Sequence, residues 1–332
     1  MNNTIVFALT SSKELTRQVC EILGIEPGKC TVNHFADGEI LVELGESVRG
    51  KDVYFIQSTN KPVNDNLMEL LIGIDACKRA SARSINAIIP YFGYARQDRK
   101  AKPRQPISSK LVASMLERAG ADRVITMDLH ATQIQGFFDI PADDITALSL
   151  LGEYIKEKEV SGDLVVVSPD HGGVVRARKL AEQLNAPIAI IDKRRPKPNV
   201  AEAMNLIGDV SGKTAILIDD IVDTAGTLTS GINMLKMKGA VKVYAACSHG
   251  VLSGPAIERL KGAGIEEFIC TNTIDQSENR KQYEDMTVIS VAPLLAACIS
   301  AIETNQSLSS ALNNAIENEE HVLMAETVTG QE

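Results

Sequence analysis

The sequence predicts an α/β protein that is built on mostly parallel sheets and divided into two similar halves. Short apolar runs rich in β-branched residues alternate with amphipathic stretches along the chain. Several of these runs are apolar at consecutive positions, which is typical of strands that are covered on both faces. With 332 residues, the chain is also long enough for about two domains. Strand–helix alternation of this kind favours a parallel sheet flanked by helices.

Nine segments have the composition expected of strands. They are TIVFAL (4–9), DVYFIQ (52–57), INAIIPYF (85–92), RVITMDL (123–129), DLVVVSP (163–169), PIAIID (187–192), TAILID (214–219), VYAACS (243–248) and EFICTN (267–272). Between the second and the third lies NLMELLIGIDACKRA (66–80), in which Leu67, Leu70, Leu71 and Ile74 form one stripe at helical spacing. The pattern therefore predicts strands joined by helical crossovers.

The two halves resemble each other in the order of their elements. Residues 51–98 and residues 213–250 each give strand, loop, helix and strand, although the sequences barely match. Gln57 and Ser58 of the first half stand where the second half has Asp219-Asp220. We therefore expect only the second half to carry an acidic site.

The predicted domain boundary lies within 141–150. Pro141 and an acidic, turn-prone stretch interrupt the strand–helix pattern there. The predicted domains are residues 1–145 and 146–310. The acidic stretch 311–332 lacks a convincing period and is expected to be a solvated tail.

Composition excludes several classes of protein. The formal net charge of −9 argues against a general nucleic-acid binder, because such proteins usually carry a basic face. The N-terminal MNNTIVFALTSS lacks the features of a signal peptide, and VAPLLAACISAI near the C-terminus is too short to span a bilayer. Six cysteines without C-x-x-C spacing indicate reduced, mostly buried thiols. We therefore expect a cytoplasmic protein that binds neither nucleic acid nor a membrane.

The stretch AILIDDIVDTAGTL (215–228) is the strongest candidate for a ligand site. Its apolar run ends at Ile218 and a helical pattern follows through Leu228, so DTAGT lies between a strand and a helix. Open α/β sheets bind ligands at such places, because free helix N–H groups attract anions and glycine permits close approach. The acidic residues suit sugar hydroxyls or a phosphate-bound cation. A capped turn with solvated carboxylates is the alternative.

Two further loops contain candidate metal ligands. In VVVSPDHGGVVRARKLA (165–181), two glycines allow the backbone to wrap an anion, and Asp170 could reach a metal ion. In MDLHATQIQGFF (127–138), Asp128 and His130 alternate at a strand end, and the acid beside the histidine favours metal binding. A simple tight turn and a structural histidine are the respective alternatives.

Two segments are strongly basic. In IIDKRRPKPN (190–199), Lys193 and Arg195 follow a buried strand and would point to one side if the strand continues. At the same sheet edge as the acidic loop, they favour a clamp for developing negative charge over a solvated face. Residues 90–110 form a cationic stretch with three prolines, typical of a mobile lid over a polyanion. A nucleic-acid arm is the alternative for this stretch.

Taken together, these segments closely resemble the ribose-phosphate pyrophosphokinases, also called phosphoribosyl-pyrophosphate synthetases, of the phosphate-activated class I. The resemblance extends from about residue 4 to about residue 310. The motifs that carry it are FADGE (35–39), STNKPVNDNLMELL (58–71), IPYFGYARQDRK (89–100), DLHATQIQGFF (128–138), SPDHGG (168–173), DKRRP (192–196) and DDIVDTAGT (219–227). The resemblance implies two phosphoribosyltransferase-type domains. It also implies transfer of pyrophosphate from Mg-ATP to C1 of ribose 5-phosphate, which gives phosphoribosyl pyrophosphate and AMP.

The same resemblance implies roles for individual residues. Lys193 and Arg195 match the charge-stabilising catalytic pair, and His130 and Asp170 match the ligands of Mg²⁺ on ATP. The residues that match ribose 5-phosphate contacts are Arg195, Asp219, Asp220, Asp223, Thr224, Ala225, Gly226 and Thr227. Those that match ATP contacts are Phe35, Asp37, Gly38, Glu39, Arg96 and Gln97. Such a transfer depends on positioning and charge neutralisation and needs no covalent nucleophile.

The resemblance further implies regulation and assembly. The expected state is a homo-oligomer, a hexamer, in which the adenine-binding segment reaches the site from a neighbouring subunit. Phosphate is the expected activator and ADP the expected inhibitor. The corresponding regulatory positions are Ser47, Arg49, Gln135, Asp143, Ser307, Ser309 and Ser310.

Three other functions compete with this interpretation. A catalytically inactive regulatory relative would lack site residues that this chain retains. A nucleobase phosphoribosyltransferase is typically a shorter, single-domain chain and would leave FADGE and YARQD unexplained. A nucleic-acid-binding module that uses residues 96–110 is opposed by the net charge.

Overall fold

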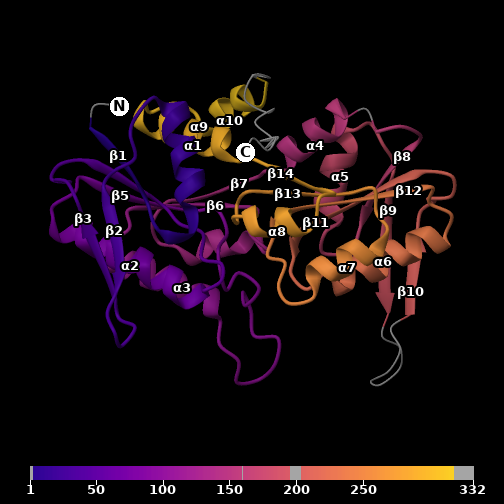
Figure 1. Cartoon of the computed structure of the whole chain (residues 1–332), viewed down its shortest axis with the longest axis horizontal. Helices are drawn as coiled ribbons and strands as arrows, with labels where there is room; N and C mark the ends of the chain where they lie inside the picture. The colour runs from indigo at the N-terminus through magenta and orange to yellow at the C-terminus, as the bar shows by residue number, and fades with distance from the viewer. Residues whose placement is uncertain (1–2, 159, 195–202, 318–332) are drawn as a thin grey trace. The chain divides into compact units, whose positions relative to one another are not determined.

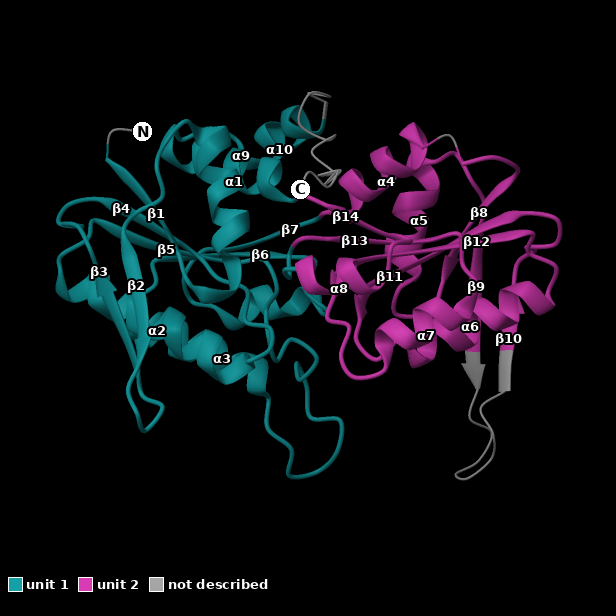
Figure 2. Cartoon of the chain, in the orientation of Figure 1, with its two compact units in different colours: residues 1–146, 273–275, 291–321 teal, residues 147–272, 276–290, 322–332 magenta. Residues whose placement is uncertain are grey.

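A computed structural model describes residues 3–158, 160–194 and 203–317 of the chain, whose elements are drawn in Figure 1. The chain divides into two compact units. The first unit contains residues 1–146, 273–275 and 291–321, and the second contains residues 147–272, 276–290 and 322–332 (Figure 2). Each unit is organised around its own sheet.

The sheet of the first unit has five parallel strands in the order β1-β4-β5-β6-β7. They are β1 (Thr4–Ala8), β4 (Asp52–Ile56), β5 (Ser84–Ile89), β6 (Arg123–Met127) and β7 (Ala142–Ile145). Every residue of β4 is buried, and β5 is buried from its second residue onward. Helices must therefore cover both faces, which explains why these strands are continuous apolar runs.

Helices lie on both faces of this sheet. They are α1 (Lys13–Leu23), α2 (Val63–Arg79), α3 (Ser108–Ala119), α9 (Ala292–Glu303) and α10 (Leu308–Glu317), with short 3-10 segments η1 (Thr10–Ser12) and η2 (Thr132–Phe137). In Figure 2, α1 and α9 lie on one face, and α2 and α3 lie on the other. One core cluster contains Phe7, Phe55 and Leu70, and the two rings stack with their centroids 5.4 Å apart. Full burial of one such side chain contributes roughly 1.5–3 kcal/mol.

A separate antiparallel hairpin, β2 (Cys30–His34) and β3 (Ile40–Leu44), belongs to the first unit. It packs against α2 through β3. Its strands are largely exposed or half-buried, so the hairpin adds little to the core and presents its tip to solvent.

The sheet of the second unit has seven strands in the order β10-β9-β8-β11-β12-β13-β14. Only β10 is antiparallel to its neighbour. The strands are β8 (Leu164–Ser168), β9 (Ile188–Arg194), β10 (Ala203–Ile207), β11 (Thr214–Val222), β12 (Lys242–Gly250), β13 (Glu267–Thr271) and β14 (Met286–Ile289). The helices are α4 (Leu148–Glu157), α5 (Val174–Gln183), α6 (Gly226–Met237), α7 (Ala256–Ala263) and α8 (Ser277–Gln282). Parallel strands joined by helices again bury the sheet on both faces.

All nine predicted strands are present, and the apolar stripe of 66–80 is buried on α2. The predicted repeat is present too, because β4-α2-β5 and β11-α6-β12 each join two neighbouring parallel strands through a helix. The sequence missed β2, β3, β7, β10 and β14. These strands stand at a sheet edge or outside the main sheets, where apolar patterning is weak.

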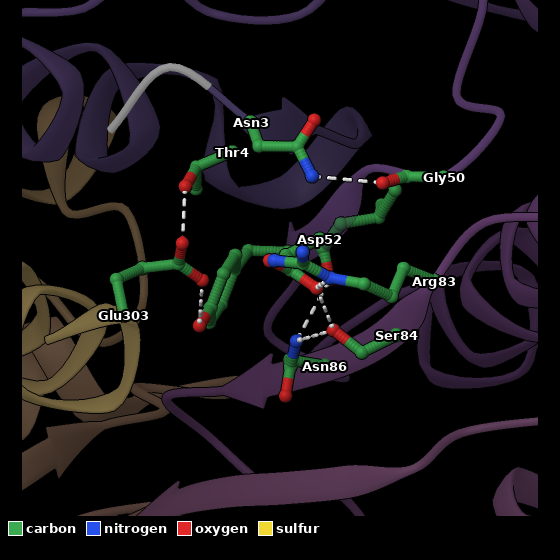
Figure 3. A network of polar contacts seen from close by, with 10 residues as sticks. Asn3, Thr4, Gly50, Asp52, Arg83, Ser84, Asn86 and Glu303 are labelled. Carbon is green, nitrogen blue, oxygen red and sulfur yellow. Dashed lines mark hydrogen bonds and ion pairs between the residues drawn. The ribbon is translucent and has the colours of Figure 1, made fainter. Parts of the chain in front are cut away.

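The C-terminal helices belong to the first unit, which corrects their predicted place in a second domain of residues 146–310. Helix α9 packs on α1. At its end, the Glu303 carboxylate accepts hydrogen bonds from the Thr4 hydroxyl (2.6 Å) and the Tyr54 hydroxyl (2.9 Å), as Figure 3 shows for Thr4. The chain therefore returns to its first sheet, and periodicity alone does not reveal such a return.

The predicted acidic tail begins later than expected. Helix α10 runs to Glu317 and so covers the first part of 311–332. Two serine hydroxyls and a backbone amide form hydrogen bonds at its start, among Ser307, Ser309 and Ser310. The rest of the predicted tail, 318–332, lies outside the described residues.

No helix in the described part of the chain is long and apolar enough to cross a membrane. All six cysteines are free thiols, and every one except the half-buried Cys30 is buried. Burial raises the pKa of the Cys77 thiol to about 12, so these side chains act as small apolar residues, as the sequence predicted.

Candidate active site

The DTAGT loop of the second unit lies between a strand and a helix, as predicted. Strand β11 ends at Val222 and helix α6 begins at Gly226. Ala225 takes a left-handed conformation (φ 57°) at the N-cap, and no side chain caps the helix. The first N–H groups of α6 therefore have no acceptor within the helix and, with the helix dipole, favour an anion. Thr224 and Thr227 are exposed at the same place and add hydroxyl donors.

Arg259 on α7 contacts this loop. Its Nη1 donates a hydrogen bond of 2.8 Å to the carbonyl oxygen of Thr224. The same nitrogen lies 3.2 Å from the point where a Cβ would stand on Gly226, so glycine leaves room for the guanidinium. The Ser253 amide also donates a hydrogen bond of 2.9 Å to the carbonyl oxygen of Asp223. The loop is thus fixed on the α7 side and has a positive charge beside its anion-binding end.

Asp219 and Asp220 lie within β11 rather than after its end. The apolar run stops at Ile218, but β11 continues to Val222 because it keeps pairing with β12 through Asp219↔Cys247 and Val222↔Gly250. Rigid strand geometry therefore holds both carboxylates. The sequence predicted a strand that ends at Asp219 (214–219), and the structure extends this strand by three residues, so that Asp220 also lies within it.

One arginine on α5 faces both acids. The Nη1 atom of Arg176 lies 3.4 Å from Oδ1 of Asp220 and 3.8 Å from Oδ1 of Asp219. Burial raises the pKa of Asp219 well above its usual range, the neighbouring Asp220 raises it further, and Arg176 opposes the rise. Asp220 itself is only 6% exposed. Such a pair is a strong acceptor for sugar hydroxyls or a cation.

Asp170 lies at the exposed turn between β8 and α5. Its Oδ1 atom accepts a hydrogen bond of 3.0 Å from the amide of Gly173. The next residue, His171, places Nε2 3.0 Å from Oδ1 of the buried Asp192 on β9. The turn is therefore tied to the strand on which Lys193 lies.

The basic segment continues β9 as a strand. Lys193 and Arg194 are the last residues of β9 and pair with Met204 and Ala203 of β10. The strand thus extends beyond its apolar run. Arg195 lies outside the described residues, so its predicted role stays a prediction.

His130 belongs to the first unit and Asp170 to the second. His130 is exposed just after β6. Asp128 nearby has a left-handed backbone (φ 42°), and its Oδ1 accepts a hydrogen bond of 2.7 Å from the Thr146 hydroxyl. Across the ranges that the structure describes, no three histidine, cysteine or acidic side chains gather in a metal-binding cluster.

The FADGE segment forms the tip of the β2–β3 hairpin (Figure 1). The Phe35 amide donates to the Glu39 carbonyl at 2.8 Å, and the Glu39 amide donates to Oδ1 of Asp37 at 3.1 Å. Gly38 has φ 94°, a conformation that glycine adopts without strain. The Phe35 side chain is left 55% exposed on this tight turn.

Arg96 and Gln97 are both exposed in the loop between β5 and α3. The Gln97 side-chain oxygen accepts a hydrogen bond of 2.6 Å from the Ser108 hydroxyl. The expected cationic loop ends earlier than predicted, because α3 begins at Ser108 and Lys110 is helical. The Lys110 ammonium donates a hydrogen bond of 2.6 Å to the Phe137 carbonyl, so it does not belong to a lid.

The predicted regulatory residues all lie in the first unit. Ser47 and Arg49 are exposed after β3, and Nη1 of Arg49 donates to the Ser81 hydroxyl at 3.4 Å. Gln135 lies in η2 and donates to the Thr132 carbonyl at 3.3 Å. The Gln135 contact is local, whereas the Arg49 contact joins residues 32 positions apart, and Ser47 and Arg49 both remain exposed.

Asp143 and the Ser307 segment lie near one cavity. Asp143 forms an ion pair with Arg123, and both line a cavity of about 320 Å³. The residues around it are Arg123, Asp143, Ala301, Ile302, Asn305, Gln306 and Leu308. Of the predicted regulatory positions, Asp143 lines this cavity, and Ser307 precedes the lining residue Leu308 in the sequence.

The second unit thus brings together the loop 223–227, the acids Asp219 and Asp220, and the cations Arg176 and Arg259. Arg259 is the residue that sequence reasoning missed. It lies on a helix outside every quoted motif, and nothing in the sequence distinguished it from Lys261 on the same helix. Two α/β units, one with an acidic strand leading into an uncapped helix start, define the phosphoribosyltransferase type of fold.

Comparison with known proteins identifies the family within this class to which the chain belongs. Residues 4–120 match the family model described as the N-terminal domain of ribose phosphate pyrophosphokinase, and residues 194–313 match the phosphoribosyl synthetase-associated domain. The ribose-phosphate pyrophosphokinase of Bacillus caldolyticus is 60% identical over 304 residues, which is 92% of this chain and 96% of that relative. The enzyme of Bacillus subtilis (strain 168) is 57% identical over 307 residues, with the same coverage.

A solved structure supports the same family. The phosphoribosylpyrophosphate synthetase from Mycobacterium smegmatis superimposes with a TM-score of 0.87 at 47% identity, covering 91% of this chain and 99% of that one. The chain belongs to the ribose-phosphate pyrophosphokinase family. The resemblance inferred from motifs, the fold class and the enzymatic function are thereby confirmed.

Proposed function

We propose that this enzyme transfers the β,γ-pyrophosphoryl group of ATP to the C1 hydroxyl of ribose 5-phosphate. The C1 oxygen bonds to the β-phosphorus, the bond from that phosphorus to the α,β-bridging oxygen breaks, and AMP leaves. The hydroxyl proton is lost to solvent or to a base. The products are 5-phosphoribosyl 1-pyrophosphate and AMP.

The main support for this proposal is that the two ends of the segment 219–227 differ in chemistry. The uncapped start of α6, with Thr224 and Thr227 exposed, suits the 5-phosphate. Asp219 and Asp220, held by β11 and faced by Arg176, suit the ribose hydroxyls. A phosphorylated sugar has an anionic end and a hydroxyl end, which need these opposite kinds of partner.

Lys193 and Arg195 are the proposed catalytic residues. Negative charge builds on the transferring group and on the departing AMP, and fixed cations stabilise that charge. The position of Lys193 in a strand supports this role, because β9 extends to Arg194. The strand is also joined to the turn that contains Asp170, through the contact between His171 and Asp192. Arg195 is also proposed to contact the sugar phosphate.

Magnesium is the proposed cofactor, with His130 and Asp170 as its protein ligands. Mg²⁺ prefers oxygen ligands and in nucleotide sites takes one or two carboxylates together with phosphate oxygens and water. The exposed Asp170 carboxylate, oriented by the Gly173 amide, fits that donor set. When bound, the ion would neutralise phosphate charge. Asp170 and His130 would orient the nucleotide through the ion.

ATP is proposed to contact Arg96 and Gln97 and the adenine-binding turn of Phe35, Asp37, Gly38 and Glu39. The exposed Phe35 ring supports adenine stacking. We infer that the turn serves the active site of a neighbouring subunit in a homo-hexamer. We also infer that the chain has two phosphoribosyltransferase-like domains that divide near residue 145.

Phosphate is the proposed activator and ADP the proposed inhibitor. Their proposed contacts are Ser47, Arg49, Gln135, Asp143, Ser307, Ser309 and Ser310. The cavity beside Asp143 supports this assignment, because polar side chains and a turn between two helices surround it.

The test is an assay for AMP formation with ribose 5-phosphate, Mg-ATP and phosphate, and with each left out. Ribose-dependent AMP is expected, and its absence would favour an inactive regulatory relative. Lys193→Ala should lower kcat by about 100- to 1,000-fold while ribose 5-phosphate still binds. Lys213→Ala, which removes a lysine paired with Asp209 (3.6 Å) at the other end of β11, is the matched control. Loss of ribose 5-phosphate binding in Lys193→Ala would contradict the catalytic assignment.

A further inference from the structure

The β4–α2 turn of the first unit occupies the same place in its sheet as the ribose-phosphate loop occupies in the second. β4 lies between β1 and β5, as β11 lies between β8 and β12, and a helix follows each. Gln57 and Ser58 replace the two aspartates and are fully buried, and Thr59 is 2% exposed. These side chains have no open face for a ligand, so their hydrogen bonds must go elsewhere.

The Thr59 hydroxyl binds the backbone of the loop that follows β5. It accepts a hydrogen bond of 2.6 Å from the Gly93 amide and donates one of 3.2 Å to the Tyr91 carbonyl. The Thr59 amide donates to the same carbonyl at 2.9 Å. The Ser58 hydroxyl accepts the Tyr91 amide at 3.1 Å. Two adjacent residues thus satisfy three backbone groups at the start of this loop.

The contact is close and leaves no room for adjustment. A Cβ on Gly93 would stand 2.4 Å from the Thr59 carbonyl oxygen, so the two backbones approach as only glycine allows. The next residue, Tyr94, has a left-handed backbone (φ 67°), a conformation that costs a bulky side chain on the order of 1–2 kcal/mol. Its hydroxyl donates to Oδ1 of Asn64 in the same β4–α2 segment. The turn therefore holds a strained backbone in place.

The far end of this short segment is fixed as well. The Gln97 carbonyl accepts hydrogen bonds from the Ser109 hydroxyl (3.0 Å) and the Ser109 amide (3.3 Å). Arg96 and Gln97 themselves are exposed between these two anchors. A guanidinium that must meet a phosphate needs such a prearranged backbone, because ordering it upon binding would cost affinity.

We propose that Thr59 is a positioning residue that holds the Arg96–Gln97 loop ready for ATP. In the first unit, the turn equivalent to the ribose-phosphate loop binds a neighbouring protein loop instead of a sugar phosphate. This inference rests on the proposed role of Arg96 and Gln97 as ATP contacts. Thr59 acts through the Tyr91–Gly93 backbone and does not touch the nucleotide.

The experiment compares Thr59→Val, Thr59→Ser and the unmodified enzyme. Valine keeps the shape but leaves the Gly93 amide without its acceptor, so the KM for ATP should rise about tenfold while the KM for ribose 5-phosphate changes less than twofold. Serine restores the hydroxyl and should return the KM for ATP to within about twofold of the unmodified value. Titration calorimetry with a non-hydrolysable ATP analogue should show the same order of affinities.

Thr214→Val is the matched control. Thr214 is also buried, and its hydroxyl donates 2.9 Å to the Ser161 carbonyl at the opposite end of a central strand. It should leave the KM for ATP unchanged. If Thr59→Val does not fold, Tyr94→Phe removes only the hydroxyl that binds Asn64 and should raise the KM for ATP about threefold.

Different results separate this inference from the proposed function. An unmodified enzyme without ribose-dependent AMP formation would overturn the proposed function. An active enzyme whose ATP affinity is unaffected in Arg96→Ala would overturn the assignment of the loop. If Arg96→Ala weakens ATP binding but Thr59→Val does not, or if Thr214→Val weakens it equally, the positioning role of Thr59 is wrong.

Discussion

The Arg259 guanidinium donates a hydrogen bond of 2.8 Å to the carbonyl oxygen of Thr224, which joins helix α7 to the loop before α6. A carbonyl oxygen would repel the phosphate that is proposed to bind here, and the guanidinium offsets that repulsion. The same group lies beside Gly226, the first residue of α6. Arg259 therefore both fixes the loop and adds positive charge at the helix start.

Arg259→Met should weaken ribose 5-phosphate binding. Methionine keeps part of the apolar stem but removes the charge, and we expect the KM for ribose 5-phosphate to rise about tenfold, a loss of roughly 1.4 kcal/mol. The KM for ATP and kcat should change less than twofold. Steady-state kinetics with each substrate varied in turn measures this.

Lys261→Met on the same helix is the control for Arg259→Met. Lys261 pairs with Glu258 at 3.7 Å and forms no hydrogen bond or ion pair with the described loop residues. Equal effects of the two substitutions would mean that general charge on α7, rather than the Thr224 contact, attracts the substrate.

Asp219 makes stability depend on pH. Burial and the Asp220 carboxylate raise its pKa in the folded protein above the unfolded value. The folded state therefore disfavours the ionised form, so the contribution of Asp219 to stability is complete below about pH 3.9 and is lost as the pH rises through the raised pKa. Burial of Asp219 therefore lowers the stability of the folded protein at neutral pH, and a ligand or cation bound at the proposed ribose site would offset this cost.

Asp219→Asn should remove the cost of burying an ionised carboxylate at this position. We expect the free energy of unfolding of this variant, measured in urea without ligands, to exceed that of the unmodified enzyme at pH 8 and to match it near pH 3.5. Ribose 5-phosphate binding should fall at the same time. Asp163→Asn, at an exposed site before β8, is the control. A variant less stable than the unmodified enzyme at pH 8 would show that the Arg176 contact outweighs the burial of Asp219.

Much of this architecture could be predicted from the sequence. The buried parallel strands are continuous apolar runs, and residues 215–228 contain an acidic segment followed by a glycine-containing helix start. The fold confirms both. These features are local, because a strand or a helix N-terminus is specified by neighbouring residues.

Features that depend on distant residues could not be predicted in this way. Arg259 meets Thr224 only because α7 packs beside α6. Glu303 meets Thr4 only because the C-terminal helices return to the first sheet. Edge strands such as β10 were missed because half-exposed residues carry a weak pattern. The extension of β11 past Ile218 is set by pairing with β12, not by its own apolar residues.

The Glu303 contacts give a test of how the C-terminal segment is attached. Tyr54 is fully buried on β4, and burial together with the Glu303 carboxylate raises the pKa of its hydroxyl. Tyr54→Phe leaves one carboxylate oxygen unpaired and should lower the free energy of unfolding by about 1–2 kcal/mol. In the double variant with Glu303→Ala, the loss of unfolding free energy should be about 1 kcal/mol smaller than the sum of the two single losses.

Thr304→Val, which removes a hydrogen bond within α9, should show no such coupling with Tyr54→Phe. Hydrogen exchange should quicken in α9 for Tyr54→Phe, and unchanged exchange there would mean that packing on α1 alone holds the helix.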